Sequence, residues 1–303
     1  MLKLALAGPG YISRRFLEGA RYLSDVKVVA LISRTPERVK AYAEKFDIPE
    51  VMTYDAFYQK EEIPAVYVCT PTPSHYAIVK ACLSHGKHVL CEKPMCLSLE
   101  EEEELFALAE ENHVLLMEAY KALFTPAYDL MKELLDQQAI GNVRYATGCF
   151  ARSGDLTRLP EHFGRDYVYD LSCYPVSFLL SLTGKKVQSA VHTEFEQDGN
   201  VLSSSIDMSC SDGCILNARS SFLYTDEMVR IYGETGMISC YQFWRPREVI
   251  LESEEGREAF PFEYESEFTF ETQHFADLIR DGFTESHIAS KSLSLTSCKV
   301  LTR

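Results

Sequence analysis

The first thirteen residues, MLKLALAGPGYIS, constrain the fold of this 303-residue chain more than any other stretch. Apolar residues from Leu2 to Ala7 predict a short buried strand, and Gly8-Pro9-Gly10 predicts a tight turn into a helix. In a β-α-β unit, such a turn presents free N–H groups and the positive end of a helix dipole to an anionic pyrophosphate. Gly10 leaves room for a phosphate, and Ser13 stands where the third glycine of a dinucleotide fingerprint would be. An ordinary strand-turn-helix has the same pattern, so the rest of the chain must decide.

The length and charge of the chain narrow the class of protein. A chain of 303 residues is long enough for two domains with separate cores. A net charge of −15 without a basic cluster argues against a nucleic-acid or anionic-membrane partner. No apolar run reaches membrane-spanning length, and no secretory signal precedes the first strand. The ten scattered cysteines, with no C-x-x-C pair, indicate free thiols and a cytoplasmic location.

The end of the second expected strand, Val26 to Ile32, bears on cofactor preference. A site that prefers NAD usually carries an acidic residue here to bind the ribose 2′-hydroxyl. This chain has Ser33 and Arg34, with Arg38 one helical turn later. A hydroxyl and a guanidinium suit a 2′-phosphate, which favours NADP over NAD. The alternative is that Arg34 and Arg38 form a solvated helix face.

The third expected strand, Ile63 to Cys69, runs into a turn that contains Thr70, Pro71 and Thr72. His75 begins the helix that follows, on the side where ligands bind in doubly wound sheets. We expect these four residues, with Tyr11 and Ile12 at the start of the first helix, to line the cofactor site. The alternative for His75 is a structural histidine.

A fourth expected strand, Lys87 to Cys91, ends in Glu92-Lys93-Pro94. This places a carboxylate and an ammonium at the edge of the same cofactor crevice, and the proline fixes the backbone, for which a cis bond is one conformation. Lys93 could hydrogen-bond the substrate oxygen that gains or loses a proton. The alternative is a surface ion pair at the end of a strand.

Alternation of strand and helix continues to the end of the first half. Ser98 and Glu101 form a capping-box pattern before a glutamate-rich helix, and Val114 to Met117 is a fifth expected strand. This alternation predicts a doubly wound parallel sheet with helices on both faces, in a Rossmann domain at residues 1–119. No metal site is expected.

The pattern changes in the second half, residues 120–303. A helix at Pro126 to Ala139 precedes strands expected at 143–150, 187–196, 201–210, 214–222, 229–232, 237–241 and 249–252. We expect an α+β domain with a large, open, mostly antiparallel sheet. An open sheet face needs a cover, which predicts a homodimer or higher homo-oligomer.

One helix in this half carries residues suited to catalysis. Asp170 and Tyr174 are four residues apart and therefore share a helix face. A tyrosine beside a lysine ammonium has a lowered pKa and can act as general acid or base for an alcohol. The alternative is a buried structural tyrosine.

Together these stretches resemble the Gfo/Idh/MocA oxidoreductases over almost the whole chain. The resemblance rests on the Gly8–Ser13 turn, Thr70-Pro71-Thr72 with His75, GKHVLCEKP at 86–94, Met117–Tyr120, and the helix with Asp170 and Tyr174-Pro175. The LLMEAY stretch and the tyrosine at 174 resemble the branch of dimeric dihydrodiol dehydrogenase and glucose–fructose oxidoreductase. The resemblance implies that Lys93 and Tyr174 bracket the reacting carbon, with Asp170 nearby, and that the open sheet mediates dimerisation.

The chain departs from the family pattern in two regions. The glycines that commonly precede and follow Asp170 are replaced, with Ser172 at the position two residues after it, and Leu123 stands where an arginine is common. The loop 151–166, with Arg152, Arg158, His162 and Arg165, either supplies substrate contacts instead or is a solvated loop.

These observations predict an NAD(P)-dependent oxidoreductase that moves a hydride between nicotinamide and a secondary alcohol or carbonyl of a sugar, polyol or cyclic diol. Two alternatives remain at this level. One is a non-catalytic NADP-binding regulator, and the other is a redox-neutral enzyme with a tightly bound cofactor.

Overall fold

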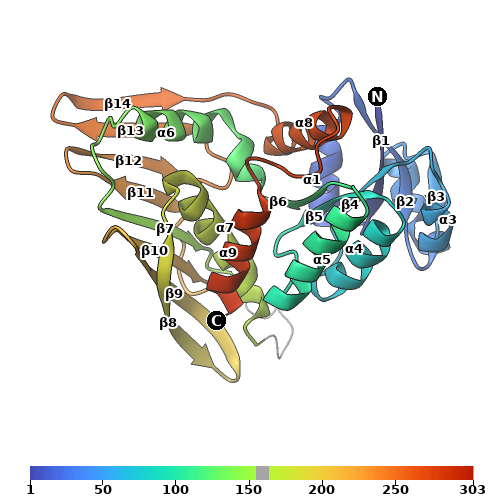
Figure 1. Cartoon of the computed structure of the whole chain (residues 1–303), viewed down its shortest axis with the longest axis horizontal. Coiled ribbons are helices and arrows are strands. Elements are labelled where there is room, and N and C mark those ends of the chain that lie inside the picture. Colours follow the sequence, from blue (N-terminus) through green and yellow to red (C-terminus); the bar gives the residue numbers. More distant parts are fainter. Residues whose placement is uncertain (155–163, 303) are drawn as a thin grey trace. The chain divides into compact units, whose positions relative to one another are not determined.

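A computed structural model describes residues 1–154 and 164–302, and these form two compact units (Figure 1). The first unit contains residues 1–121 and 265–298, with residue 302. The second contains residues 122–264 and 299–301. The sequence predicts a single domain boundary at residue 119, and that prediction does not include residues 265–298 in the first unit.

The first unit is built on a parallel sheet of six strands in the order β3-β2-β1-β4-β5-β6. The strands are β1 (Leu2–Ala7), β2 (Val26–Ile32), β3 (Glu50–Met52), β4 (Ala65–Val68), β5 (His88–Glu92) and β6 (Leu116–Ala119). The helices are α1 (Tyr11–Ala20), α2 (Pro36–Lys45), α3 (Tyr54–Tyr58), α4 (His75–Ser84), α5 (Leu99–Glu111), α8 (Glu267–Arg280) and most of α9 (Lys291–Thr302), whose residues 299–301 belong to the second unit. The expected parallel sheet is confirmed, with β3 as an additional strand.

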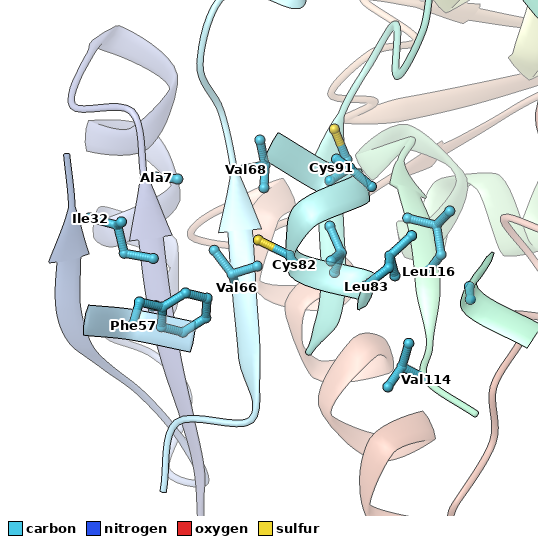
Figure 2. Close-up of a cluster of buried hydrophobic side chains, with 14 of the residues drawn as sticks. Ala7, Ile32, Phe57, Val66, Val68, Cys82, Leu83, Cys91, Val114 and Leu116 are labelled. Carbon is cyan, nitrogen blue, oxygen red and sulfur yellow. The ribbon is translucent and has the colours of Figure 1, made fainter. Parts of the chain in front are cut away.

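One face of this sheet packs against α3, α4 and α5. Figure 2 shows Phe57 of α3 over the β1 and β2 side, and Cys82 of α4 directed toward Val66 of β4. Leu83, the next residue of α4, is also fully buried. Both faces of β4 are covered, which is why this strand consists only of apolar residues.

The opposite face packs against α1 and α8. The Phe16 ring of α1 stacks on Tyr67 of β4 with centroids 4.0 Å apart, and it meets Phe268 of α8 edge-on at 6.3 Å. Gly19 allows close approach of the two helices, because a Cβ there would lie 2.6 Å from Ser266 Oγ. The C-terminal segment thus completes the core of the first unit.

Local capping explains where several helices begin. Ser98 Oγ accepts a hydrogen bond from Glu101 N–H at 3.3 Å, so the expected cap of α5 is confirmed. Ser74 and Thr35 precede α4 and α2 but do not cap them with their side chains. Ser74 Oγ instead lies within hydrogen-bond distance of Pro71 O at 2.7 Å and of Thr70 Oγ1 at 2.8 Å, which orders the turn before α4.

The second unit contains an eight-stranded sheet in the order β14-β13-β12-β11-β7-β10-β9-β8. The strands are β7 (Tyr145–Ala151), β8 (Val187–Gln197), β9 (Asn200–Cys210), β10 (Ile215–Ser221), β11 (Met228–Tyr232), β12 (Gly236–Tyr241), β13 (Glu248–Ser253) and β14 (Gly256–Pro261). Only β7 and β10 pair in parallel, so the expected mostly antiparallel sheet is confirmed. The edge strand β14 is additional to the strands expected.

Helices α6 (Pro126–Asp136) and α7 (Asp166–Thr183) pack on one face of this sheet. Gly148 of β7 permits the approach of α7, because a Cβ there would lie 3.0 Å from Pro175. On the other face, Val191, Ile215 and Tyr232 are exposed apolar side chains. Their positions follow the strand alternation that places successive residues on opposite faces.

Two global observations complete the fold. None of the ten cysteines, all of which lie in the described residues, forms a disulfide, and all except Cys69 are buried, which confirms the expectation of thiols without a disulfide framework. Among the residues that the structure describes, no helix has both the length and the apolar character needed to span a membrane.

Candidate functional site

The turn between β1 and α1 has the geometry that a dinucleotide phosphate requires. Gly8 has φ +104°, and a Cβ there would lie 2.7 Å from the carbonyl oxygen of Cys69, so only glycine fits. Gly10 is different, because a Cβ added there would meet nothing within 4 Å. The space beside Gly10 and the first-turn N–H groups of α1 form a cradle that fits a pyrophosphate.

Ser13 has a more specific role in this turn than a small packing residue would have. The N–H of Gly10 donates to Ser13 Oγ at 2.7 Å, and Ser13 Oγ donates back to Gly10 O at 3.1 Å. Ser13 Oγ also shares a 2.8 Å hydrogen bond with the hydroxyl of Tyr42, which comes from α2. Burial raises the pKa of Tyr42, which keeps this phenol protonated. Sequence reasoning missed Tyr42 because it belongs to no motif.

The other residues expected to line the cofactor site follow β1 and β2 in the sequence. Tyr11 is 64% exposed and Ile12 is half-buried at the start of α1. Ser33, directly after β2, accepts a hydrogen bond from Thr35 N–H at 3.1 Å. Arg34 and Arg38 are exposed. Burial raises the pKa of Tyr54 to about 12, and the positive charge of Arg34 opposes that rise.

The Thr70-Pro71-Thr72 turn follows β4, and the Glu92-Lys93-Pro94 segment follows β5. Because β4 and β5 are adjacent parallel strands, both segments lie at the carboxyl edge of the sheet with the Gly8–Gly10 turn. His75 is 1% exposed, and its two ring nitrogens lie within hydrogen-bond distance of the carbonyl oxygens of Thr70 and Pro94. The structure therefore gives His75 backbone partners, whether or not it also lines the cofactor site.

Lys93 is held in a polar setting that is almost closed to solvent. Its side chain is only 8% exposed, so this is not the surface ion pair that the sequence also allowed. The preceding residue, Glu92, accepts a hydrogen bond from the buried hydroxyl of Tyr67, and the Lys93–Pro94 peptide is cis. Burial and the Glu92 charge raise the pKa of Tyr67 well above its usual value, so this phenol stays a donor.

Glu118 of β6 fixes the next residue of the same segment. Its Oε1 accepts from Met95 N–H at 2.9 Å, and its Oε2 accepts from the Tyr120 hydroxyl at 2.6 Å. Burial raises the pKa of Glu118, while these two bonds and the positive charge of Lys93 oppose that rise. The Glu-Ala-Tyr motif therefore supports the backbone that carries Lys93.

Asp170 and Tyr174 belong to the second unit, on helix α7, and both are half-buried. The Tyr174 ring packs on Phe150 of β7 with centroids 4.5 Å apart. Phe150 also meets Trp244 edge-on at 6.0 Å. Phe150 and Trp244 are residues that sequence reasoning missed, because isolated aromatic residues in strands and loops carry no motif.

The two departures from the family pattern have plain structural consequences. Ser172 is buried and donates to the carbonyl of Val168 at 2.8 Å, while Leu123 is a buried apolar side chain. In the loop 151–166, Arg152 forms an ion pair with Glu227 at 2.5 Å and Arg165 with Glu194 at 2.5 Å. Arg158 and His162 lie outside the described residues.

The parallel sheet, the glycine cradle and the two polar segments beside it define a dinucleotide-binding α/β protein. Comparison with known proteins agrees with this class. Residues 2–120 match the model of an oxidoreductase family with an NAD-binding Rossmann fold, and residues 128–239 match the GFO/IDH/MocA C-terminal domain. The chain belongs to the Gfo/Idh/MocA oxidoreductase family, and the expected NAD(P) cofactor and oxidoreductase class are confirmed.

Relatives match along nearly the full length of the chain. Trans-1,2-dihydrobenzene-1,2-diol dehydrogenase of Xenopus laevis is 29% identical, over 95% of this chain and 92% of that protein. The scyllo-inositol 2-dehydrogenase (NADP(+)) IolU of Bacillus subtilis is also 29% identical, over 99% of this chain and 95% of that protein. KijD10, a 3-ketoreductase from Actinomadura kijaniata, has a similar fold, with a TM-score of 0.86 at 23% identity over 99% and 95% of the two chains.

Proposed function

We propose that this oxidoreductase interconverts a secondary alcohol and the matching carbonyl of a sugar, polyol or cyclic diol. The observation that carries the proposal is Lys93, a nearly buried ammonium at the cofactor edge of the sheet, on a segment fixed by Glu118. The relatives named as dihydrodiol and inositol dehydrogenases support this substrate class.

In this proposal Lys93 binds the reacting oxygen of the substrate. When the alcohol becomes a carbonyl, the oxygen passes through a state with partial negative charge, which an ammonium donor stabilises in a site with little water. When bound, the nicotinamide cofactor supplies or accepts the hydride. The protein orients the substrate carbon and controls the proton.

Tyr174 is proposed as the group that passes this proton, with Asp170 next to it on α7. Packing on Phe150 fixes the phenol ring. The positive charge of Lys93 would favour the phenolate form if both side chains reach the same substrate. Lys93 and Tyr174 belong to different units, so the kinetics of single and double variants test whether they act on the same substrate.

Single and double variants test the pairing. We expect Lys93→Met to lower kcat by about 10²–10³, the usual effect of losing one transition-state donor, with the NADPH Kd nearly unchanged. Tyr174→Phe should also lower kcat. If both groups act at one reacting centre, the double variant should lose little more than the worse single variant. Turnover is followed by nicotinamide absorbance over a panel of sugars and diols.

Lys87→Met is a matched control for the removal of a buried lysine. Lys87 is 4% exposed, and its ammonium donates to Lys60 O at 2.6 Å and Ile63 O at 3.1 Å. It therefore has a structural role away from the carboxyl edge of the sheet. Lys87→Met should lower the melting temperature but keep turnover per folded molecule. Normal turnover by Lys93→Met would refute the role given to Lys93, and tight NADPH binding without any turnover by the wild type would favour the regulator.

We further propose that the exposed face of the eight-stranded sheet is covered by a second copy of the chain. Val191, Ile215 and Tyr232 lie exposed on this face, and the Tyr145 and Tyr232 rings pack with centroids 5.8 Å apart. Exposed apolar side chains grouped on one sheet face favour association. A symmetric dimer would bury the same patch on both partners.

A further inference from the structure

The environment of His75 is unusual for a buried histidine. The ring is 1% exposed and lies at the first position of α4. Its Nε2 lies 2.6 Å from the carbonyl oxygen of Thr70, and its Nδ1 lies 3.0 Å from the carbonyl oxygen of Pro94. Both ring nitrogens therefore face a backbone carbonyl oxygen.

A carbonyl oxygen can only accept a hydrogen bond, so each of these contacts requires an N–H on the ring. A neutral imidazole has one N–H and one lone pair, whereas the imidazolium has two N–H groups. In either neutral tautomer, one nitrogen lone pair would face an oxygen lone pair at the observed distance. We infer that His75 is an imidazolium that joins the Thr70 turn to the Lys93–Pro94 segment through two donated hydrogen bonds.

His88 in the same unit provides the opposite case. The N–H of Leu115 donates to His88 Nδ1 at 2.9 Å, so this nitrogen must carry a lone pair. Burial also lowers the pKa of His88, in agreement with a neutral ring. Buried His75 and half-buried His88 thus differ in protonation because their backbone partners differ: His75 faces two acceptors and His88 faces a donor.

The position of His75 between the Thr70 turn and the Lys93–Pro94 segment indicates what its two hydrogen bonds do. The Thr70 turn follows β4 and Lys93 follows β5, so His75 connects the ends of two adjacent strands at the cofactor edge. Other ionisable groups on these segments or bonded to them are Cys69 before the turn, Glu92 with its partner Tyr67, Lys93, and Glu118 with its partner Tyr120, while residues 70–74 have no ionisable side chain. His75 is therefore a positioning residue that sets the backbone from which Lys93 extends. This inference rests on the proposed role of Lys93.

The protonation state can be measured on the wild-type protein without any activity assay. Long-range ¹H–¹⁵N spectra of ¹⁵N-histidine-labelled protein at pH 7.5 distinguish imidazolium from neutral rings, and loss of signals in His75→Gln and His88→Gln assigns the two residues. We expect two protonated nitrogens for His75 and one for His88. A neutral His75 ring at this pH would overturn the inference, whatever the enzyme assays show.

The positioning role is tested by kinetics. His75→Phe removes both donors and should lower kcat roughly ten- to a hundredfold, the range for losing charge-assisted hydrogen bonds, while the NADPH Kd changes less than about threefold. His75→Gln keeps one donor group and should recover part of the loss. His85→Phe is the matched control, because His85 is exposed near the other end of α4, where its ring bonds to Ala81 O of the same helix and stacks on Tyr58.

The outcomes separate this inference from the proposed function. Wild-type kcat in His75→Phe would refute the positioning role even if Lys93→Met is inactive. Normal turnover by Lys93→Met would refute the role of Lys93. The protonation state of His75 would still be decided by the ¹H–¹⁵N spectra. If His75→Phe does not fold, His75→Gln and the wild-type spectra still decide.

Discussion

Replacing Gly10 by alanine separates binding of the cofactor from folding of the protein. The backbone of Gly10 has φ −168°, an extended conformation that any residue adopts, and an added Cβ would meet no atom within 4 Å. The protein without cofactor therefore loses nothing. It should gain about 0.4–1 kcal/mol, because alanine restricts the unfolded chain more than glycine does. The same Cβ would occupy the space that we assign to the pyrophosphate.

The magnitude follows from linkage. NADPH at a hundred times its Kd stabilises the wild type by about 2.7 kcal/mol. For a unit of this size, each kcal/mol shifts the melting temperature by about 2–4 °C. We therefore expect a ligand-induced rise of roughly 5–10 °C in the wild type and almost none in Gly10→Ala. Differential scanning fluorimetry with and without NADPH measures both values.

Gly8→Ala is the comparison variant. At φ +104°, with a Cβ 2.7 Å from Cys69 O, this change strains the backbone even without cofactor. We expect a loss of at least about 1–3 kcal/mol of folding free energy. A Gly10→Ala protein that still shows the full NADPH-induced rise would refute the placement of the pyrophosphate beside Gly10.

Three further predictions follow from the described residues. Arg34→Ala should weaken NADPH binding about ten- to a hundredfold, the range for a hydrogen bond to a charged group, and leave NADH binding unchanged in fluorescence titrations; equal losses would contradict a role at the 2′-phosphate. The double change of Val191 and Tyr232 to arginine should convert a dimer to a monomer in light scattering, and a monomeric wild type would contradict the covered sheet face. Burial and the neighbouring His287 lower the pKa of His274 to about 4. As the pH falls below 6.5, protons therefore bind the unfolded state before the folded state, and the free energy of unfolding decreases. The decrease should be less than about 1 kcal/mol per pH unit, because the His274 ring is half-exposed. His274→Gln should make the free energy of unfolding less dependent on pH in this range.

The strands of the first unit could be predicted because each buried strand is an apolar run that ends in a turn. Val26–Ile32 and Ala65–Val68 are examples, and both are covered on two faces. The three residues of Glu50–Met52 are too few to show a periodicity, so β3 was missed. Gly256–Pro261 is an edge strand rich in charged residues, which looks like a loop in the sequence.

The candidate site could be predicted only where a motif is continuous along the chain. The glycine turn and the Glu92-Lys93-Pro94 segment are local patterns, and strand order brings them to one edge. The hydrogen bond between Ser13 and Tyr42, and the packing of Phe150 on Tyr174, join residues far apart in sequence. Such contacts depend on how helices settle on their sheets, and no local spacing encodes them.

The return of residues 265–298 to the first unit has a consequence for how the chain is made. The core of this unit closes only when Phe268 reaches Phe16, and Phe268 lies near the end of the chain. On the ribosome, the part of this sheet face that α8 covers therefore stays exposed until residues 122–264 have been synthesised. A fragment that stops at residue 264 would leave that part exposed and prone to aggregation.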